Sequence, residues 1–375
     1  MKIKFAKFLA ATALLTFASF GASFGALAAE DWKKTWDATL AKAKGQKLVI
    51  SVHSAEGFAA TVQVFQKAFP DIKTEVTEII PDAMVTRVVG EQKNGVYAWD
   101  SMWASSSNMN SVMIGAGVFQ DLEPFLILPE VKDAANWRNP KYMWSTARAK
   151  QVFIHSLYAS TLSYVNLDNA KGVKIEKLED LLNPKLKGMI GIRDPYRING
   201  GTWTFGSYYL DKGPDFMKRF YGEMDLVVNM NPRQAADAVM RGDLAVGTGV
   251  TNDVITRCRQ AGGCEQVKEL PFGNVVGPKG VAIFKNAPNK EAATIWVNWF
   301  LSKAGQQAFV EVYAKSNDSG AVSMRKDVEP INAQQAKTAP DYANLDNAFI
   351  PGTDNGDDIQ KKAMDLYIQV KGGPR

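Results

Sequence analysis

The chain has 375 residues, of which 46% are hydrophobic and 22% charged, and its 44 basic and 39 acidic side chains give a formal net charge of +5. This composition is typical of a globular protein and excludes a long disordered or low-complexity chain. The small charge excess gives no indication of nucleic acid as a partner.

The first 28 residues have the three-part pattern of a secretory signal. Three lysines precede an uncharged apolar run at 8–17, and Ala26-Leu27-Ala28 has the small-x-small form that signal peptidase recognises. A membrane anchor is the alternative, but glycines break the apolar run and leave it short for a spanning helix. We therefore predict a signal peptide over 1–28, with cleavage after Ala28.

Removal of this segment would take three lysines and no acidic residue from the chain. The remaining residues, about 347 of them, carry 41 basic and 39 acidic side chains, a net charge of +2. A chain of that length predicts roughly two domains. No later stretch is long and apolar enough to span a bilayer, so we expect the mature protein not to be membrane-spanning.

The rest of the chain alternates short apolar strands with amphipathic helices in two blocks. In the first block the predicted strands are 48–52, 73–79 and 99–103, and the predicted helices are 58–69 and a segment that starts at Pro81. In the second block the strands are 189–193 and 244–247, and the helices are 202–210, 214–221, 232–241 and 252–260. A strand at 280–284 and helices at 289–301 and 305–313 follow. This alternation predicts α/β architecture with mostly parallel sheets.

Two extended segments connect the blocks and are predicted to cross between them. Gln151–Asn166 is rich in β-branched and aromatic residues, and Leu270–Val276 would be the return. Two crossings predict two α/β lobes joined by a hinge, with a ligand cleft between them. We assign 29–150 plus 275–375 to lobe 1 and 151–274 to lobe 2, and interpret the polar C-terminal tail as a strap over the first lobe.

Cys258 and Cys264 are the two cysteines of the chain. An exported protein meets oxidising conditions, and Gly262 and Gly263 allow the sharp turn that would bring the two Cα atoms within bridging distance. Two free thiols or a metal-binding pair are the alternatives, although two thiols without a nearby histidine make a poor zinc site. We predict a local, structural disulfide.

Several segments together resemble one family. They are the first strand and helix start at 48–58, the third strand at 99–103, the links at 117–122 and 178–188, the helix–Gly–strand element at 236–247 and the helix pair at 289–308. Their order and spacing resemble class II periplasmic solute-binding proteins, in particular the family-1 extracellular solute-binding proteins of the iron(III), spermidine/putrescine, thiamine and phosphonate type. The resemblance implies two α/β lobes with a ligand cleft lined by loops and helix N-termini. It also implies three partners, namely a small-molecule solute, an ABC permease and its ATPase.

Serines precede two of the predicted helices. Ser54 follows the first strand, and Ser105 and Ser106 follow the third. Helix N-termini present unpaired N–H groups and a positive dipole end, so hydroxyls beside them suit carboxylate, phosphate or phosphonate oxygens. Ordinary N-capping is the alternative for each serine. Because the resemblance places these positions in the cleft, we include all three as candidate ligand residues.

The run from Arg193 to Trp203 combines two arginines, a Gly-Gly pair, a hydroxyl and an aromatic ring at the end of a predicted strand. Arg193 or Arg197 would form a bidentate pair with a planar anion, Thr202 would cap the following helix, and Trp203 would contribute a flat wall. A surface or inter-loop ion pair, for instance with Asp194, is the alternative for each arginine, and an ordinary core position is the alternative for Trp203.

Arg233 and Thr251 open two further helices of the second block and occupy cleft positions in the resembling fold. The alternatives are a solvated surface charge for Arg233 and an N-cap for Thr251. Both complete the set of candidate ligand residues.

Iron(III)-binding members of the resembling family use adjacent tyrosines just after the strand that here spans 244–247. This sequence has Thr248-Gly249-Val250-Thr251 there, and its Tyr208-Tyr209 pair falls inside an aromatic helix that is predicted to be core. His53 and His155 are the two imidazoles of the chain. We therefore predict no metal ligands and no cofactor.

The resulting hypothesis is a periplasmic, monomeric solute-binding protein of an ABC importer, without catalysis, for a small anionic or zwitterionic solute. Iron(III), polyamine or thiamine binding is the alternative within the family. An exported hydrolase is the alternative of another class, but the sequence has no Gly-x-Ser-x-Gly elbow, no Cys/His pair and no His-Glu-x-x-His. A receptor-docking sensor remains a third possibility.

Overall fold

The computed structural model describes residues 31–52, 56–79, 81–196, 202–229, 232–250, 252–315 and 322–373. The predicted signal peptide and three candidate ligand residues, Ser54, Arg197 and Thr251, lie outside this part of the chain. A helix at 31–43 precedes the first strand.

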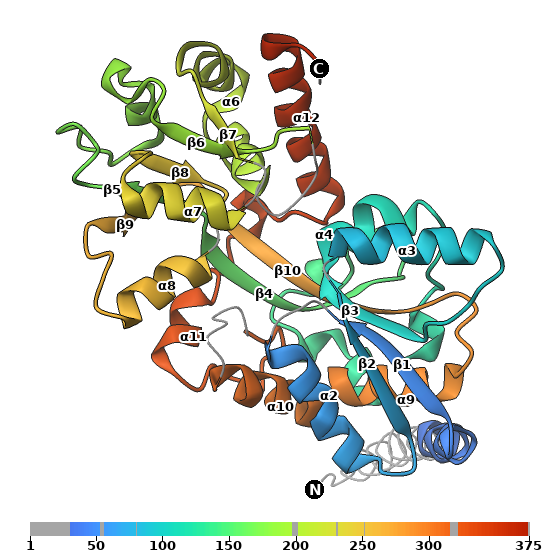
Figure 1. Cartoon of the computed structure of the whole chain (residues 1–375). Coiled ribbons are helices and arrows are strands. Elements are labelled where there is room, and N and C mark those ends of the chain that lie inside the picture. Colours follow the sequence, from blue (N-terminus) through green and yellow to red (C-terminus); the bar gives the residue numbers. More distant parts are fainter. Residues whose placement is uncertain are drawn as a thin grey trace, which may run out of the picture.

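One lobe is built on a five-stranded sheet with the order β2-β1-β3-β10-β4 (Figure 1). Its strands are β1 (Lys47–Val52), β2 (Lys73–Glu78), β3 (Ser101–Ser105), β4 (Phe153–Thr161) and β10 (Asn274–Ile283). β1 is parallel to β2 and β3, whereas β10 is antiparallel to β3 and β4. The helices of this lobe are α2 (Glu56–Ala68), α3 (Pro81–Lys93), α4 (Ser106–Asn108), α5 (Pro129–Lys132), α9 (Lys290–Leu301), α10 (Lys303–Ala314) and α11 (Ala333–Thr338).

Both faces of this sheet are covered because its strands carry apolar residues on both sides. On one face Trp103 of β3 is fully buried and packs against Phe58 of α2, Phe300 of α9 and Phe309 of α10. On the other face Met102 packs with residues of α3 and of the π-helix Met109–Ile114. The first lobe is therefore a three-layer sandwich with one core on each side of the sheet.

The second lobe is built on a sheet with the order β7-β6-β8-β5-β9. Its strands are β5 (Ser163–Asn166), β6 (Ile190–Arg193), β7 (Val227–Asn229), β8 (Val246–Thr248) and β9 (Val267–Glu269). Its helices are α6 (Trp203–Glu223), α7 (Pro232–Arg241) and α8 (Asn252–Gln260). The backbone leaves the helical region at Gly213, where φ is 73° and ψ is −174°, so α6 consists of two successive helices that correspond to those predicted at 202–210 and 214–221.

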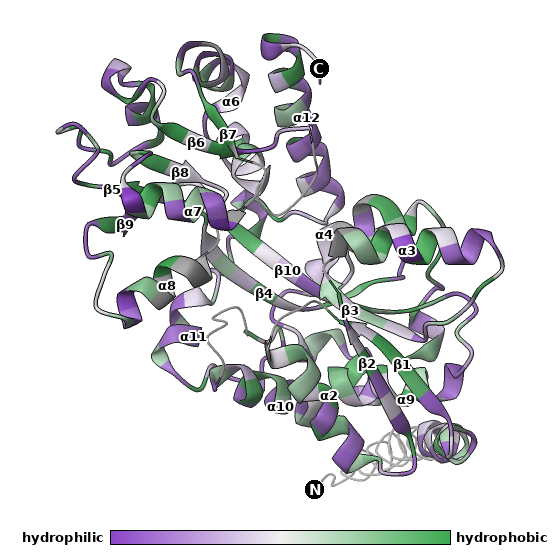
Figure 2. Cartoon of the chain, viewed as in Figure 1, coloured by the Kyte–Doolittle hydropathy of each residue, from purple (hydrophilic) through white to green (hydrophobic). Residues whose placement is uncertain are grey.

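The predicted pair of α/β lobes is confirmed, and both sheets are mixed. In each sheet two pairings are parallel and two antiparallel. All the antiparallel pairings involve β5 or β10, the strands that adjoin the crossings. Strand–helix alternation in the sequence does not show that these two strands run antiparallel to their neighbours. Figure 2 shows β1 and β6 coloured as largely hydrophobic and α12 as a mixture of hydrophilic and hydrophobic residues.

Two crossings between the lobes lie where the sequence predicted them. β4 of the first sheet ends at Thr161 and β5 of the second begins at Ser163, so one residue, Leu162, separates them. The return runs from Glu269, the end of β9, to Asn274, the start of β10. β4 and β10 pair antiparallel up to Thr161 and Asn274, so the two crossings lie side by side.

A third crossing differs from the predicted strap. The tail contributes Met324, Val328 and Ile350 to the core of the first lobe. It then enters α12 (Asp354–Lys371), which lies beside α6 in the second lobe (Figure 1).

Ala363 and Tyr367 of α12 are buried in the second lobe's core, and the hydroxyl of Tyr221 in α6 donates to the Ala363 carbonyl at 3.2 Å. The prediction that the whole tail covers the first lobe is therefore wrong for 354–371, because α6 offers the apolar face that α12 buries. We therefore assign 354–371 to the second lobe. The other predicted lobe boundaries stay a prediction.

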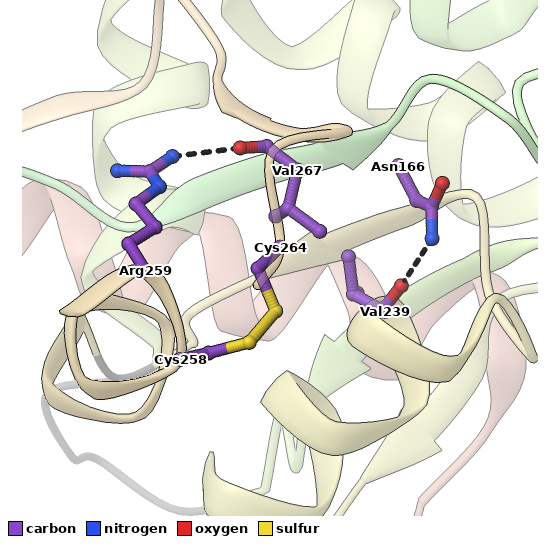
Figure 3. The surroundings of a disulfide bond; sticks show 6 residues. All are labelled: Asn166, Val239, Cys258, Arg259, Cys264 and Val267. Carbon is purple, nitrogen blue, oxygen red and sulfur yellow. Dashed lines mark hydrogen bonds between the residues drawn. A yellow bond between two sulfur atoms is a disulfide. The ribbon is translucent and has the colours of Figure 1, made fainter. Parts of the chain in front are cut away.

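The predicted disulfide is present. Cys258 in α8 and Cys264 before β9 are bonded, with their Cα atoms 5.8 Å apart (Figure 3). Gly262 adopts φ 81°, which closes the turn between them. Arg259 donates to the Val267 carbonyl at 2.7 Å beside the bridge. The disulfide thus fixes the end of α8 to the start of β9.

We expect reduction of this disulfide to lower the free energy of unfolding by about 2 kcal/mol, the value for a loop of this length in the unfolded chain. Urea unfolding with and without a thiol reductant measures the change. A Cys258→Ser/Cys264→Ser double variant is the control, because the reductant should not alter its unfolding. Equal midpoints for the oxidised and reduced wild type would contradict a stabilising bridge.

Candidate functional site

The carboxyl ends of the parallel strands in both sheets lie next to the crossings. In the first sheet, Ser105 at the end of β3 pairs with Lys279, and Ser101 at its start pairs with Ile283, farther from the crossing. In the second sheet, Thr248 at the end of β8 pairs with Ser163, the first residue after the crossing. β6 and β7 are aligned with β8, so Arg193 at the end of β6 lies at the same edge. Side chains that follow strands of both lobes therefore lie on the sides of the two sheets that face the lobe junction, the usual place for a ligand in open α/β sheets.

Ser105 and Ser106, at the end of β3 and the start of α4, have different surroundings. Ser105 is partly exposed and its hydroxyl lies 3.1 Å from that of Ser107. Ser106 is fully buried and its hydroxyl donates to the Gly352 carbonyl of the tail at 3.3 Å. A Cβ on Gly352 would lie 2.3 Å from the Ser107 nitrogen, so only glycine allows the tail to pass this close. Ser105 therefore stays a candidate ligand residue, and Ser106 holds the third crossing.

Arg193 is buried at the end of β6, with 7% of its surface exposed, and its neighbour Asp194 is 6% exposed. Asp194 accepts a hydrogen bond from the Tyr196 nitrogen at 2.9 Å. This burial argues against a solvated surface ion pair for Arg193. A buried guanidinium is costly unless surrounding groups compensate its charge, so Arg193 stays a candidate ligand residue, with a buried inter-loop ion pair as its alternative.

Thr202 and Trp203 begin α6 but do not match their predicted roles in full. Thr202 makes no side-chain cap to α6, and its hydroxyl accepts a hydrogen bond from Gln360 of α12 at 2.7 Å. Trp203 is 7% exposed and packs with Val275 and Phe349 at the crossings. The predicted N-cap is thus replaced by a contact between the two helices, because α12 occupies the space beside Thr202.

Arg233 lies at the second position of α7 with an exposed side chain. Its place after β7 puts it at the same edge of the second sheet as Arg193, which agrees with the predicted neighbourhood. Its exposure is also what a solvated surface charge would show, so Arg233 remains a candidate on position alone.

Lys279 is a charged residue at the junction that the sequence reasoning missed. It is 6% exposed, and its ammonium lies 4.5 Å from the ring centre of Tyr313 and 5.1 Å from that of Tyr158. The rings of Phe58 and Phe309 are 5.5 and 6.0 Å away. Aromatic faces attract a cation, and the attraction is larger when water is excluded. The signal available in the sequence was a lysine inside an otherwise uncharged strand, NVVGPKGVAI.

The strand pairing around Lys279 is irregular. Lys279 pairs with Ser156 of β4, whereas Gly280 pairs with Ile154, so His155 is passed over. Such β-bulges redirect side chains and are common beside functional sites. Here the bulge places His155 and Ser156, consecutive residues, near the same face of the sheet as Lys279.

His155 is fully buried and neutral. Trp103 donates to its Nε2 at 2.8 Å, and Gln306 lies 3.3 Å from its Nδ1. Burial, followed by the charge of Lys279, lowers the pKa of His155 to about 3. Because Trp103 uses the Nε2 lone pair, this imidazole is unsuited to hold a metal ion.

This pKa predicts a pH dependence of stability. Histidine in an unfolded chain titrates near pH 6.5. Between about pH 6.5 and 3, His155 is therefore protonated in the unfolded chain and neutral in the folded chain. Stability should therefore fall as the pH drops through this window, by up to about 1.4 kcal/mol per pH unit from this group. Urea unfolding from pH 7 to 4, compared with His155→Gln, isolates the effect. Parallel stability curves for the two proteins would contradict it.

Tyr208, the first residue of the tyrosine pair, is buried in the second lobe's core. Tyr208 is fully buried, and its hydroxyl is 2.8 Å from that of Ser163. Burial raises its pKa, which favours the neutral phenol over the tyrosinate that ligates iron. Within the part of the chain that the structure describes, no group of three or more His, Cys, Asp or Glu side chains could hold a metal ion.

Comparison with known proteins agrees with this architecture. The family model described as bacterial extracellular solute-binding protein matches residues 60–344, more than half of the chain. The chain belongs to this family. A curated relative of this solute-binding protein, an uncharacterised protein of Haemophilus influenzae, is 28% identical over 211 residues, which cover 53% of this chain and 57% of the relative.

Two solved structures show the same fold. Iron-bound HitA from Pseudomonas aeruginosa aligns with a TM-score of 0.63 and 17% identity, covering 87% of this chain and 99% of HitA. AfuA from Actinobacillus pleuropneumoniae, with fructose-6-phosphate bound, aligns with a TM-score of 0.56 and 19% identity, covering 86% and 98%. At these identities the likeness shows the fold alone. In the described residues of this solute-binding protein, no helix is both long and apolar enough to span a membrane.

Proposed function

We propose that this solute-binding protein acts in the periplasm as the capture component of an ABC importer, binding a small anionic or zwitterionic solute between its lobes. The observation that carries the proposal is a buried cation in each lobe, on the side of each sheet that faces the junction. Arg193 ends β6 of the second sheet, and Lys279 lies beside the end of β3 in the first.

The charges of these two residues suit an anion. A guanidinium can form two parallel hydrogen bonds with a carboxylate or phosphate, and an ammonium adds a point charge. Ser105, partly exposed after β3, could donate a further hydrogen bond. A ligand that contacts both lobes would favour the closed arrangement, because its binding energy is realised only when both walls are present.

The ligands held by the similar structures support binding rather than catalysis. HitA holds iron and AfuA holds a sugar phosphate, both on this fold. In this chain the neutral, hydrogen-bonded His155 is unsuited as a general base. We therefore propose no enzymatic activity, an ABC permease and ATPase as partners, and a monomer.

A thermal-shift screen of the purified mature protein tests the proposal, because a ligand that binds the native state raises the melting temperature. The panel contains carboxylates, phosphonates, sugar phosphates, polyamines, thiamine and ferric complexes. Stabilisation by a carboxylate, phosphonate or sugar phosphate is the expected result. Stabilisation by a polyamine, thiamine or ferric complex alone would reject the anionic solute, and turnover of an ester, phosphate or glycoside would reject the non-enzymatic role.

A further inference from the structure

Trp203 has a buried hydrogen-bond donor that the fold leaves unused. Its ring is packed with Val275, Phe349 and Ile359, and 7% of its surface is exposed. The indole Nε1 is buried and has no hydrogen-bond acceptor among the described residues. Most buried donors in native proteins are paired, because burying an unpaired one costs free energy.

Gln360 of α12 has the complementary feature, an unused acceptor. It is 1% exposed, and its Nε2 donates to the Thr202 hydroxyl at 2.7 Å. This bond fixes the side-chain amide at the start of α6 and directs Nε2 to Thr202. The other amide atom, Oε1, is buried without a donor among the described residues.

The two unused groups belong to side chains in the same neighbourhood of the fold. Trp203 follows Thr202 in the chain, and Gln360 contacts Thr202 while its neighbour Ile359 packs on Trp203. Leu162, Val275 and Phe349, which lie in or beside the three crossings, belong to the same cluster. The donor and the acceptor therefore lie at the lobe junction, beside the N–H groups that begin α6.

A hydroxyl group can satisfy both at once, since it accepts one hydrogen bond and donates another. We propose that Trp203 Nε1 and Gln360 Oε1 bind a hydroxyl of the solute, so that the solute is a hydroxylated anion, such as a hydroxycarboxylate or a polyol phosphate. This inference rests on the proposed function and extends it, because it adds a residue of the C-terminal helix to the site. A buried water offers the same hydroxyl chemistry and is the competing source.

Matched pairs of anions with and without the hydroxyl distinguish these sources. The probes are malate and succinate, citrate and tricarballylate, and glycerol 3-phosphate and propyl phosphate, each titrated by calorimetry into the mature protein. We expect the wild type to bind the hydroxylated member of at least one pair about tenfold tighter or more, because a site built for a hydroxyl rejects the analogue that lacks it. Trp203→Phe keeps the ring and removes the N–H, so the preference should fall to about twofold or less, with little change for the analogue.

Trp296→Phe is the matched control. Trp296 Nε1 is likewise buried without a partner in the described residues, but the ring lies in the first lobe's core against Phe65 and Phe300. Its removal should leave the preference unchanged. Gln360→Met repeats the test from α12 if Trp203→Phe does not fold.

The remaining outcomes distinguish failure of this inference from failure of the proposed function. A preference that survives both Trp203→Phe and Gln360→Met overturns this inference and leaves the proposed function standing. If the wild type binds anions without any preference for the hydroxylated member, Trp203 Nε1 and Gln360 Oε1 bind a water molecule. That outcome overturns this inference and leaves the proposed function standing. Absence of binding by every anion rejects the anionic solute and this inference together.

Discussion

Replacing Arg193 with alanine should weaken the binding of the anionic solute at least about thirtyfold. Removing one partner of a buried, hydrogen-bonded charge pair costs about 2–5 kcal/mol, and 2 kcal/mol corresponds to about a thirtyfold change in Kd. Arg193 has 7% of its surface exposed, so little water can replace the guanidinium. Lys279→Met should have an effect of similar size from the other lobe, with methionine filling the space among the aromatic rings.

Exposed cations provide the controls for these two variants. Arg241 is exposed and paired with Asp243 at the end of α7, and Lys285 is exposed just after β10. Arg241→Ala and Lys285→Met should keep the wild-type Kd in calorimetric titrations with the anion selected by thermal shift. Lys279→Met should also retain the unfolding free energy of the ligand-free protein, because apolar replacement of a buried charge is often neutral or stabilising. Wild-type affinity in Arg193→Ala and Lys279→Met would remove the observation on which the proposed function depends.

Truncation after Thr353, which removes α12, should unfold the second lobe. α12 buries four large apolar side chains, each at most 9% exposed: Ile359, Leu366 and Tyr367 pack against α6 and the crossings, and Met364 is buried as well. Burial of four such side chains contributes on the order of 6 kcal/mol. This is comparable with the whole stability of a domain, so we expect the lobe not to fold without the helix.

Limited proteolysis read by mass spectrometry measures this outcome. Cleavage should appear within 163–269 of the truncated chain, while the sheet formed by β1, β2 and β3 stays protected. A chain that ends at Gly372 is the control and should resist the protease like the full chain, since α12 is complete in it. Full protection of the Thr353 truncation would show that the lobe is stable without α12.

Local pattern was sufficient to predict the individual elements and their class. Strand and helix periodicity depends on neighbours a few positions away, so the alternation at 48–103 and 189–260 predicted the α/β lobes that the structure has. The same holds for the crossing at Gln151–Asn166, whose β-branched and aromatic run becomes β4 and β5. The disulfide, too, was predictable, because six residues with two glycines confine Cys258 and Cys264 to the same neighbourhood.

The site depended more on tertiary contacts. Sequence order placed Arg193 and Ser105 at strand ends, and the register shows those ends beside the crossings. It did not indicate that Ser106 would be engaged by the tail or that Thr202 would meet Gln360, since these partners are 246 and 158 positions apart. Lys279 was missed for the same reason, because its aromatic neighbours come from α2, β4 and α10.

The sequence by itself therefore determined the α/β class, two of the crossings, the disulfide and the resemblance to solute-binding proteins, all of which follow from short-range pattern or ordered motifs. The tertiary structure alone decided that α12 joins the second lobe and that Arg193 and Lys279 are buried, one in each lobe. Both features depend on which apolar faces remain uncovered once the sheets have formed. A hydrophobic face in the sequence indicates that it will be buried, but it does not indicate which other element will cover it.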